Sequence, residues 1–267
     1  MESARPISAR RTPDAADRDA LFDSQLQDVL GLRQPVGVEP TGPLLLVVSG
    51  DVEPEGVLRQ LEAAFDDLPA GAWQVPGIAE PGQPVEIEAR VAHPIAQERI
   101  GYVVRVPQPR PESAAAWQVA LYVLSHGYEG RLGKQAISQQ GLVYYIDSEY
   151  QTDGGNDWIS LSMGVDSGKL PAVKRLLKEE LVRLREDPPS EAEIEEAKEH
   201  FLGRHLSAYQ SNAELVDNLT RQWIWYRDVL EYEQWQQQLA AVQRQDVLDL
   251  LPAFTRGSII VVRNPQE

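Results

Sequence analysis

The chain has 267 residues, of which 42% are hydrophobic, so it is long enough to bury a substantial core in one or two domains. Its net charge of −16 argues against a nucleic-acid-binding surface, because such surfaces depend on clustered Lys and Arg. The sequence contains no cysteine, which excludes disulfides, thiolate zinc ligands and thiol nucleophiles.

The first third of the chain shows no segment typical of a membrane protein or an exported precursor. No run of 18 or more apolar residues occurs and the N-terminus has no apolar signal core, so we expect neither a membrane span nor a signal peptide. Residues 1–16 mix Arg with Ser, Pro and Asp and are expected to be a flexible lead. The apolar spacing over residues 15–30 predicts a helix, and residues 35–43 read as a linker rich in Pro and Gly.

A strand followed by a helix is predicted next. The continuous apolar run from Leu44 to Val48 is typical of a strand that is buried on both faces. Glu53, Pro54 and Glu55 predict a helix start, because Pro fits a first helical turn and acidic residues suit its positive end. The buried stripe of this helix is expected to consist of Val57, Leu58, Leu61, Ala64, Phe65 and Leu68.

Residues 71–83 are interpreted as a linker between two parts of the chain, because they are rich in Pro and Gly. Periodicity beyond this linker predicts strands at residues 85–89, 99–106, 143–150, 158–165 and 258–263. The same patterns predict helices at residues 113–125, 131–139, 170–185, 190–209, 212–229, 232–242 and 245–254, with a corner at 244–246. Ser190 with Glu193 forms a capping-box pattern. The fold class predicted from these elements is α+β.

No catalytic residue and no metal ligand is assigned from motifs. The four histidines are His93, His126, His200 and His205. His200 and His205 are five residues apart, which places their rings ~140° apart around a helix and does not suit a shared ion. The sequence contains no His-x-x-Glu-His, no G-x-S-x-G and no glycine-rich nucleotide-binding motif, so its motifs alone indicate no enzymatic activity.

Four stretches in order carry a resemblance to a known family. They are "LLLVVSGDVEPEGVLRQLEAAFDDLP" from residue 44, "HGYEGRLGKQAISQQGLVYYIDSEY" from residue 126, "SEAEIEEAKEHFLGRHLSAYQS" from residue 190 and "VQRQDVLDLLPAFTRGSIIVVRNP" from residue 242. Together they resemble the pitrilysin/insulinase family of zinc metallopeptidases. Because His-x-x-Glu-His is missing, the chain is similar to a non-catalytic, C-terminal unit of that family.

The resemblance implies a mostly antiparallel sheet backed by several helices, a unit like those of LuxS and mitochondrial processing peptidase. Residues 17–70 would form the closing helix–strand–helix part of a preceding unit, and residues 84–264 one inactive-domain unit. The chain would hold no cofactor; zinc is expected on a partner unit, in the same parent polypeptide or on a separate subunit. The two units would enclose a peptide substrate. The alternative is a structural or assembly subunit with no role in proteolysis.

The resemblance also points to one corner of the unit as a substrate site. In active relatives an Arg and a Tyr from this corner help to bind substrate and stabilise the oxyanion, and Tyr144 matches that Tyr. Ser138 stands where the family's Arg usually begins, and Arg131 matches a different, more structural Arg. Tyr144, Tyr145 and Arg131 are therefore the candidate substrate-binding residues, with packing as the competing interpretation. The family's bacterial members suggest the periplasm as the location, with the cytoplasm as the alternative.

Overall fold

The computed structural model describes the greater part of the chain. The described ranges are residues 18–31, 45–66, 83–92, 97–107, 113–153, 156–207, 211–226, 229 and 232–264. The predicted flexible lead at residues 1–16 and nearly all of the predicted linker at 71–83 lie outside these ranges.

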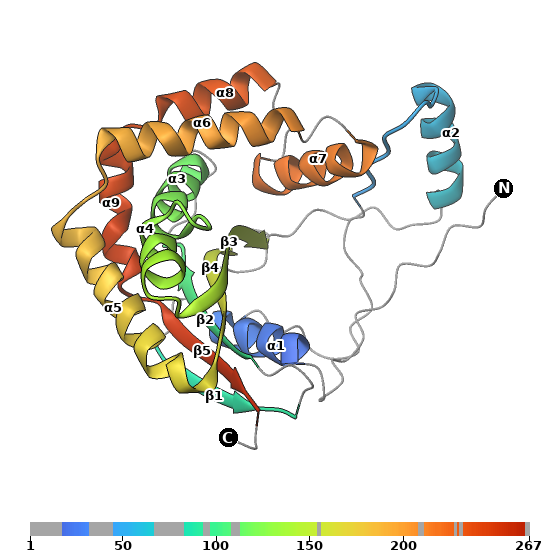
Figure 1. Cartoon of the computed structure of the whole chain (residues 1–267). Coiled ribbons are helices and arrows are strands. Elements are labelled where there is room, and N and C mark those ends of the chain that lie inside the picture. The colour runs from blue at the N-terminus through green and yellow to red at the C-terminus, as the bar shows by residue number, and fades with distance from the viewer. Residues whose placement is uncertain are drawn as a thin grey trace.

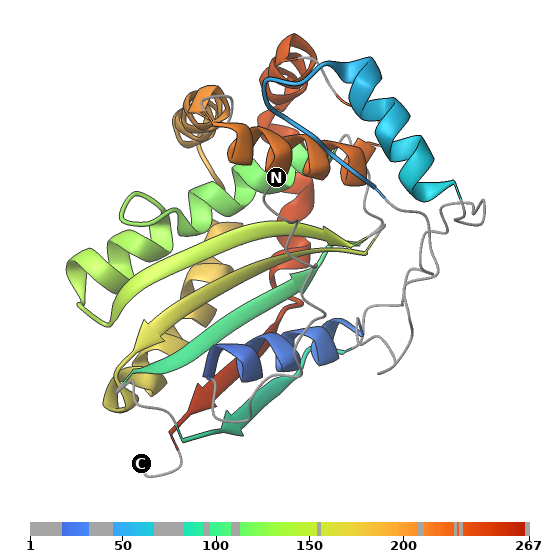
Figure 2. The same ribbon diagram turned by 90° about the vertical axis from the view of Figure 1, so that its right-hand side faces the viewer.

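A five-stranded sheet forms the centre of the fold (Figure 2). Its strands in the spatial order β1-β5-β2-β4-β3 are β1 (Glu86–Arg90), β5 (Ser258–Arg263), β2 (Glu98–Arg105), β4 (Asn156–Val165) and β3 (Val143–Asp153). The β1–β5 pair is parallel and the other pairs are antiparallel, so the sheet is mixed. The prediction of a mostly antiparallel α+β unit is confirmed.

Among the described elements, several helices cover one face of this sheet, and the helix at residues 18–30 lies on the other (Figure 1). The helices are α1 (Arg18–Leu30), α2 (Pro54–Phe65), α3 (Ala114–Ser125), α4 (Arg131–Gly133), α5 (Leu170–Glu186), α6 (Glu191–Ser207), α7 (Asn212–Tyr226), α8 (Tyr232–Ala241) and α9 (Arg244–Phe254). A π-helical turn, η2 (Lys134–Gln139), continues α4, and a 3-10 turn, η3 (Ser167–Lys169), precedes α5. Helices α3, α5 and α9 pack on the sheet, and α6 and α8 lie outside α3.

The core lies between the sheet and α3, α5 and α9. Alternate residues of β2, such as Ile100 and Val104, face these helices and are fully buried. Trp117 of α3 stacks on Phe254 of α9 with ring centroids 5.5 Å apart, which joins the two helices in the centre of the core. β5 lies between β1 and β2, and this central position explains why its whole apolar run is buried.

The other side of the sheet, opposite α3, α5 and α9, is called the open face below. Helix α1 crosses β2 and β5 on this face (Figure 2) and buries Phe22 and Leu30 against Val103, Ile260 and Val262. Two arginines of β2 fix the ends of α1. Arg99 Nη1 pairs with Asp19 at 3.0 Å and Arg105 Nη1 donates to the Leu30 carbonyl at 2.6 Å. The β3–β4 part of the open face lies beside α1 and is not crossed by it.

Three expectations from the sequence are wrong: the buried strand at residues 44–48, the buried stripe of the helix that follows it, and the corner at residues 244–246. Residues 45–49 are not assigned to a strand of the described sheet, and Leu46 and Val48 are exposed. Helix α2 begins at Pro54 as expected, but none of its residues is buried, because no described element covers its apolar stripe. The corner before α9 falls at residues 242–243 and not at 244–246, because Gln243 and Asp246 form the capping box of that helix.

Candidate substrate-contact corner

The corner between α3 and β3 is built by close backbone contacts. Helix α3 ends at Ser125 and is capped by His126, whose N–H donates to the Tyr122 carbonyl at 2.9 Å, and Gly127 then turns the chain with φ of +38°. A Cβ atom on Gly133 would lie 1.6 Å from the Gly127 carbonyl oxygen, so only glycine fits at residue 133. The interpretation of the corner as a fold element is consistent with this crowding.

A bulge in β3 decides where the two tyrosines point. The register against β4 shifts between Val143 and Ile146, and both of these residues are buried on the helix-covered side. Tyr144 and Tyr145 occupy the irregular part of the strand. The ring of Tyr145 lies over Gly164 of β4, where a Cβ atom would come within 2.5 Å of the ring. Tyr145 therefore packs on the open face, in space that Gly164 leaves free.

Tyr144 is the most exposed of the three candidate residues. Its side chain is 53% exposed, and its phenol O–H is 3.1 Å from both carboxylate oxygens of Asp166 at the end of β4. Lys169 Nζ lies 3.0 Å from Asp166 Oδ2 and 5.9 Å from the centroid of the Tyr144 ring. The Lys169 ammonium, followed by the phenol, keeps the pKa of Asp166 below its ordinary value. The corner thus presents a phenol, a carboxylate and an ammonium together at the surface.

Lys169 and Asp166 were missed by sequence reasoning. Lys169 also donates to the Gly141 carbonyl at 3.1 Å and so ties η3 to the start of β3. These residues are more than 20 positions from Tyr144 along the chain, and no motif links them to it. The antiparallel pairing of β3 with β4 brings the end of β4 beside the start of β3. A prediction that these two strands pair would therefore have placed Asp166 and Lys169 near Tyr144.

Arg131 is engaged by the connection between α5 and α6. Its Nε and Nη2 atoms form a bidentate pair with Glu193 at 2.7 and 2.8 Å, and Nη1 donates to the Asp187 carbonyl. Glu193 also accepts from the backbone N–H of Ser190, which confirms the predicted capping box. The hydrogen bond from Arg131 is the main cause that lowers the pKa of Glu193 to about 2. These contacts favour the structural interpretation of Arg131, while its substrate role stays a prediction.

The described histidines do not form a zinc site. His126 and His200 lie in ring contact, with centroids 4.3 Å apart, and both pack on Tyr122. Within the described ranges, no three His, Asp or Glu side chains gather in a geometry that suits a metal ion. His205 lies on the same helix as His200, but its side chain is outside what the structure describes. The donors in the part of the chain that the structure describes therefore form no site for the family's zinc, and no catalytic step is assigned to it.

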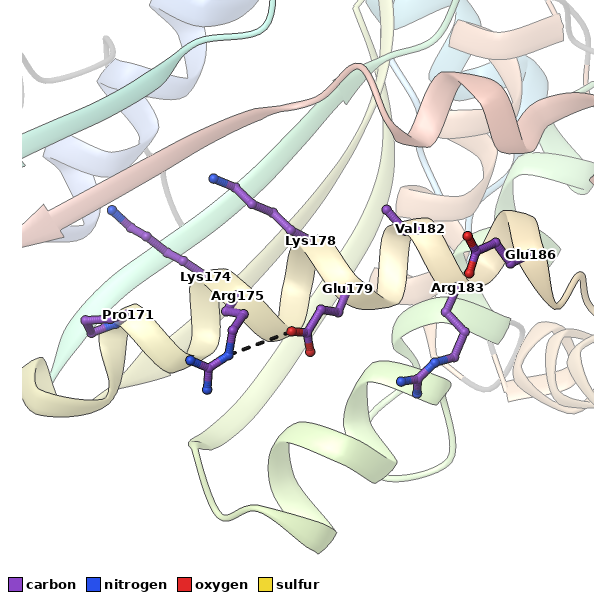
Figure 3. A pocket seen from close by; sticks show the side chains of 8 residues that line it. All are labelled: Pro171, Lys174, Arg175, Lys178, Glu179, Val182, Arg183 and Glu186. Carbon is purple, nitrogen blue, oxygen red and sulfur yellow. Dashed lines mark ion pairs between the residues drawn. The ribbon is translucent and has the colours of Figure 1, made fainter.

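A hollow of about 740 Å³ lies along the outer side of α5 (Figure 3). Its lining residues are Pro171, Lys174, Arg175, Lys178, Glu179, Val182, Arg183 and Glu186. Each of its cationic side chains lies within 4 Å of an acidic one; the pairs are Lys174–Glu86, Lys178–Glu86, Arg175–Glu179 and Arg183–Glu180. Because Lys174 and Lys178 share Glu86, these four cationic side chains are paired with three carboxylates.

Comparison with known proteins places this geometry in a family. The sequence profile described as "Peptidase M16 inactive domain" matches residues 44–201, which is more than half of the chain. The chain therefore belongs to the peptidase M16 inactive-domain family. A search of curated proteins finds no match. In the described part of the chain, none of the helices has the length and apolarity that crossing a bilayer requires.

Solved structures share the fold at low identity. A peptidase M16 inactive domain from Pseudomonas fluorescens has a TM-score of 0.63 and 18% identity, over 79% of this chain and 50% of that one. A chain of the complex III dimer from Candida albicans has a TM-score of 0.63 and 14% identity, over 80% and 53%. The periplasmic protease PqqL from Escherichia coli has a TM-score of 0.56 and 15% identity, over 80% and 24%. The chain thus spans about half or less of the length of these structures.

Proposed function

We propose that this chain forms the non-catalytic wall of a peptide-holding chamber in a pitrilysin/insulinase-type zinc peptidase. The zinc-bearing unit lies outside this chain and would face the open face of its sheet. The observation that carries the proposal is the exposed group of Tyr144, Asp166 and Lys169 at the start of the edge strand β3. The family membership supports it, because the matched family is that of inactive peptidase domains.

The corner has the chemistry that a peptide backbone requires. The Tyr144 O–H and the Lys169 ammonium are donors for a peptide carbonyl or a terminal carboxylate, and Asp166 is an acceptor for a peptide N–H. β3 lies at the edge of the sheet, so one side of its backbone is turned away from β4. Exposed Asp147 and Glu149 continue along the same strand. A peptide laid along this edge would meet the donors first and the carboxylates further on.

Photo-crosslinking tests this role. A peptide library with a photoreactive side chain is irradiated with the full chain, alone and together with a zinc-bearing chain of the family, and the crosslinked sites are mapped. We expect crosslinks at the corner and along β3, and a several-fold loss of crosslinking with Tyr144→Phe, which removes the donor but keeps the ring. Tyr128→Phe is the matched control, because Tyr128 is another exposed tyrosine in the same corner. Crosslinks elsewhere, or equal yields for both variants, would contradict the proposal.

Elemental analysis tests the assignment of zinc to the partner unit. We expect no stoichiometric zinc and no peptidase activity for this chain alone. Tightly bound zinc together with peptidase activity that is lost on chelation would overturn that assignment. A location in the bacterial periplasm rests on the family resemblance and stays a prediction.

A structural or assembly subunit is the second candidate function. It is favoured by the engagement of Arg131 with Glu193 and by Ser138 at the position where the family's Arg is expected. Under this alternative the chain associates stably with a partner protein and binds no peptide. The crosslinking experiment separates the two functions, because only the first predicts labelling at the corner.

A further inference from the structure

Strand β1 lies at one edge of the sheet, and within the described ranges no strand pairs with its outer side (Figure 2). Its inner side pairs with β5, where the Val85 carbonyl accepts a hydrogen bond at 2.9 Å and the Val91 N–H donates one at 3.0 Å. Backbone groups of successive residues in a strand point in alternate directions. The N–H and C=O groups of Glu86, Glu88 and Arg90 therefore point away from β5, toward the edge.

The side chains of β1 complement those of a second, reversed copy of the same strand. Glu88 and Arg90 lie on the same side of β1 and form an ion pair at 2.8 Å. If a second β1 runs antiparallel with Ala89 opposite Ala89, Glu88 of each copy faces Arg90 of the other, and Ile87 faces Val91. This register also places outward-pointing backbone groups opposite each other, as hydrogen bonding requires. The neighbouring register, centred on Glu88, would oppose two carboxylates.

The hollow along α5 lies beside this edge (Figure 3). Lys174 and Lys178, which line it, contact Glu86 of β1 at 2.7 and 3.5 Å. The lining also includes Val182, a large hydrophobic side chain that is 51% exposed. A twofold axis perpendicular to the sheet at Ala89 keeps α5 of a second copy on the same face of the joined sheets. The hollows of the two copies would then lie on the same side of the junction, where Val182 can be covered.

The charge balance at this edge suits a second copy. The chain carries a net charge of −16, so two copies repel each other over much of their surface. Along the hollow, the cationic side chains are matched in number by carboxylates; the groups are Lys174, Arg175, Lys178 and Arg183 with Glu86, Glu179, Glu180 and Glu186. The other edge strand, β3, exposes Asp147 and Glu149, which have the same sign. Two copies therefore meet at a lower electrostatic cost through β1 than through β3.

We propose that two copies of this chain associate by antiparallel pairing of their β1 edges, centred on Ala89, with the α5 hollows at the junction. The two sheets then form one continuous sheet across the twofold axis. The inference does not rest on the proposed function, because the open face and the β3 edge both stay free in such a pair.

Sedimentation velocity of the full chain over a range of concentrations, at about 0.15 M salt, tests the pairing. We expect a reversible dimer. Glu88→Pro removes an N–H that points to the edge and removes no hydrogen bond to β5, so it should raise the Kd of the dimer at least about 100-fold. Its thermal unfolding, measured where the unsubstituted chain is monomeric, should match that of the unsubstituted chain, because an edge strand tolerates proline in this orientation.

Charge reversal tests the register. Glu88→Arg and Arg90→Glu should each raise the Kd about 10-fold, because each places like charges opposite one another across the junction. The double variant restores the pairs in reverse, and its Kd should lie within about threefold of that of the unsubstituted chain. Glu149→Arg is the matched control and should leave the Kd unchanged, because it makes the same change of net charge as Glu88→Arg but on the exposed edge strand β3.

Hydrogen exchange provides an independent measurement. The amides of Glu88 and Arg90 should exchange rapidly in the monomer and become protected in the dimer. A chain that stays monomeric up to about 100 µM, or a dimer that Glu88→Pro does not weaken, would overturn the pairing. A double variant that binds no better than the single ones would overturn the register centred on Ala89. Each of these results leaves the crosslinking test at Tyr144 unaffected, so failure of this inference is distinguishable from failure of the proposed function.

Discussion

The contact between Arg131 and Glu193 is expected to stabilise the unit in a pH-dependent way. The bidentate pair connects α4 to the start of α6, and Arg131 also donates to the carbonyl groups of Asp187 and Pro188. The Arg131 side chain is 16% exposed, so the pair is shielded from solvent on one side. Replacing it with methionine keeps the length of the side chain and removes the charge and the donors.

The magnitude follows from the pKa of Glu193. A pKa lowered from 4.5 to about 2 corresponds to about 3 kcal/mol in the free energy of unfolding at 1.36 kcal/mol per pKa unit. Ser190 contributes to this shift, and the Glu193 side chain is 31% exposed, so solvent screening leaves about 1–2 kcal/mol for the ion pair. Loss of the hydrogen bonds from Arg131 to the backbone carbonyl groups lowers the free energy of unfolding by about 1 kcal/mol more, and this part is the same at every pH. Arg131→Met is therefore expected to cost about 2–3 kcal/mol at pH 7.

Urea unfolding between pH 7 and pH 2 measures this effect. Because the pKa of Glu193 is lower in the folded chain than its ordinary value of 4.5, the contribution of the pair is complete above pH 4.5 and is lost as the pH falls toward 2. The difference between the unsubstituted chain and Arg131→Met should thus shrink over that range to the part due to the carbonyl groups. Arg175→Met, whose partner Glu179 is 3.8 Å away on an exposed helix surface, should change stability by less than about 0.5 kcal/mol. An equal loss at pH 7 and pH 2 would refute the reasoning.

Two further predictions concern packing and are measured by thermal unfolding. Gly133→Ala should destabilise the unit by about 3 kcal/mol or more, because the new Cβ would overlap the Gly127 carbonyl. Gly203→Ala is the control and should stabilise the unit by up to about 1 kcal/mol, because Gly203 lies on a helix with open space around it. An unchanged stability of Gly133→Ala would show that the corner is not crowded. Trp117→Ala should cost about 3–5 kcal/mol because the ring is 1% exposed, and the partly exposed Trp223 should tolerate the same change at a much lower cost. Equal losses for the two tryptophans would contradict the assignment of the core.

Local signals in the sequence predicted most elements of the fold. The Ser190–Glu193 capping box, the apolar run of β5 and the amphipathic pattern of α5 each depend on residues that are close together in the chain. Strand β1 shows the predicted alternation, because its successive side chains point to opposite faces of the sheet and one of these faces is more exposed. These elements were predictable because hydrogen-bonding partners and periodicity lie within a few residues of each other.

The grouping at the candidate site depended on the tertiary structure. A strict period of two would place Tyr145 on the same side as Val143, but the bulge turns it over Gly164. The pairing of β3 with β4 then brings Asp166 and Lys169 to Tyr144, which no sequence spacing indicated.

The elements that cover each apolar surface could likewise be identified only from the tertiary structure. The sequence by itself determined that residues 44–48 are apolar enough for a buried strand and that residues 54–65 form an amphipathic helix. Only the structure showed that neither segment is covered by the described part of this chain, while α1 lies on the open face. The physical reason is that an apolar pattern indicates how much surface must be buried. Which strand or helix buries that surface depends on how all the elements pack together.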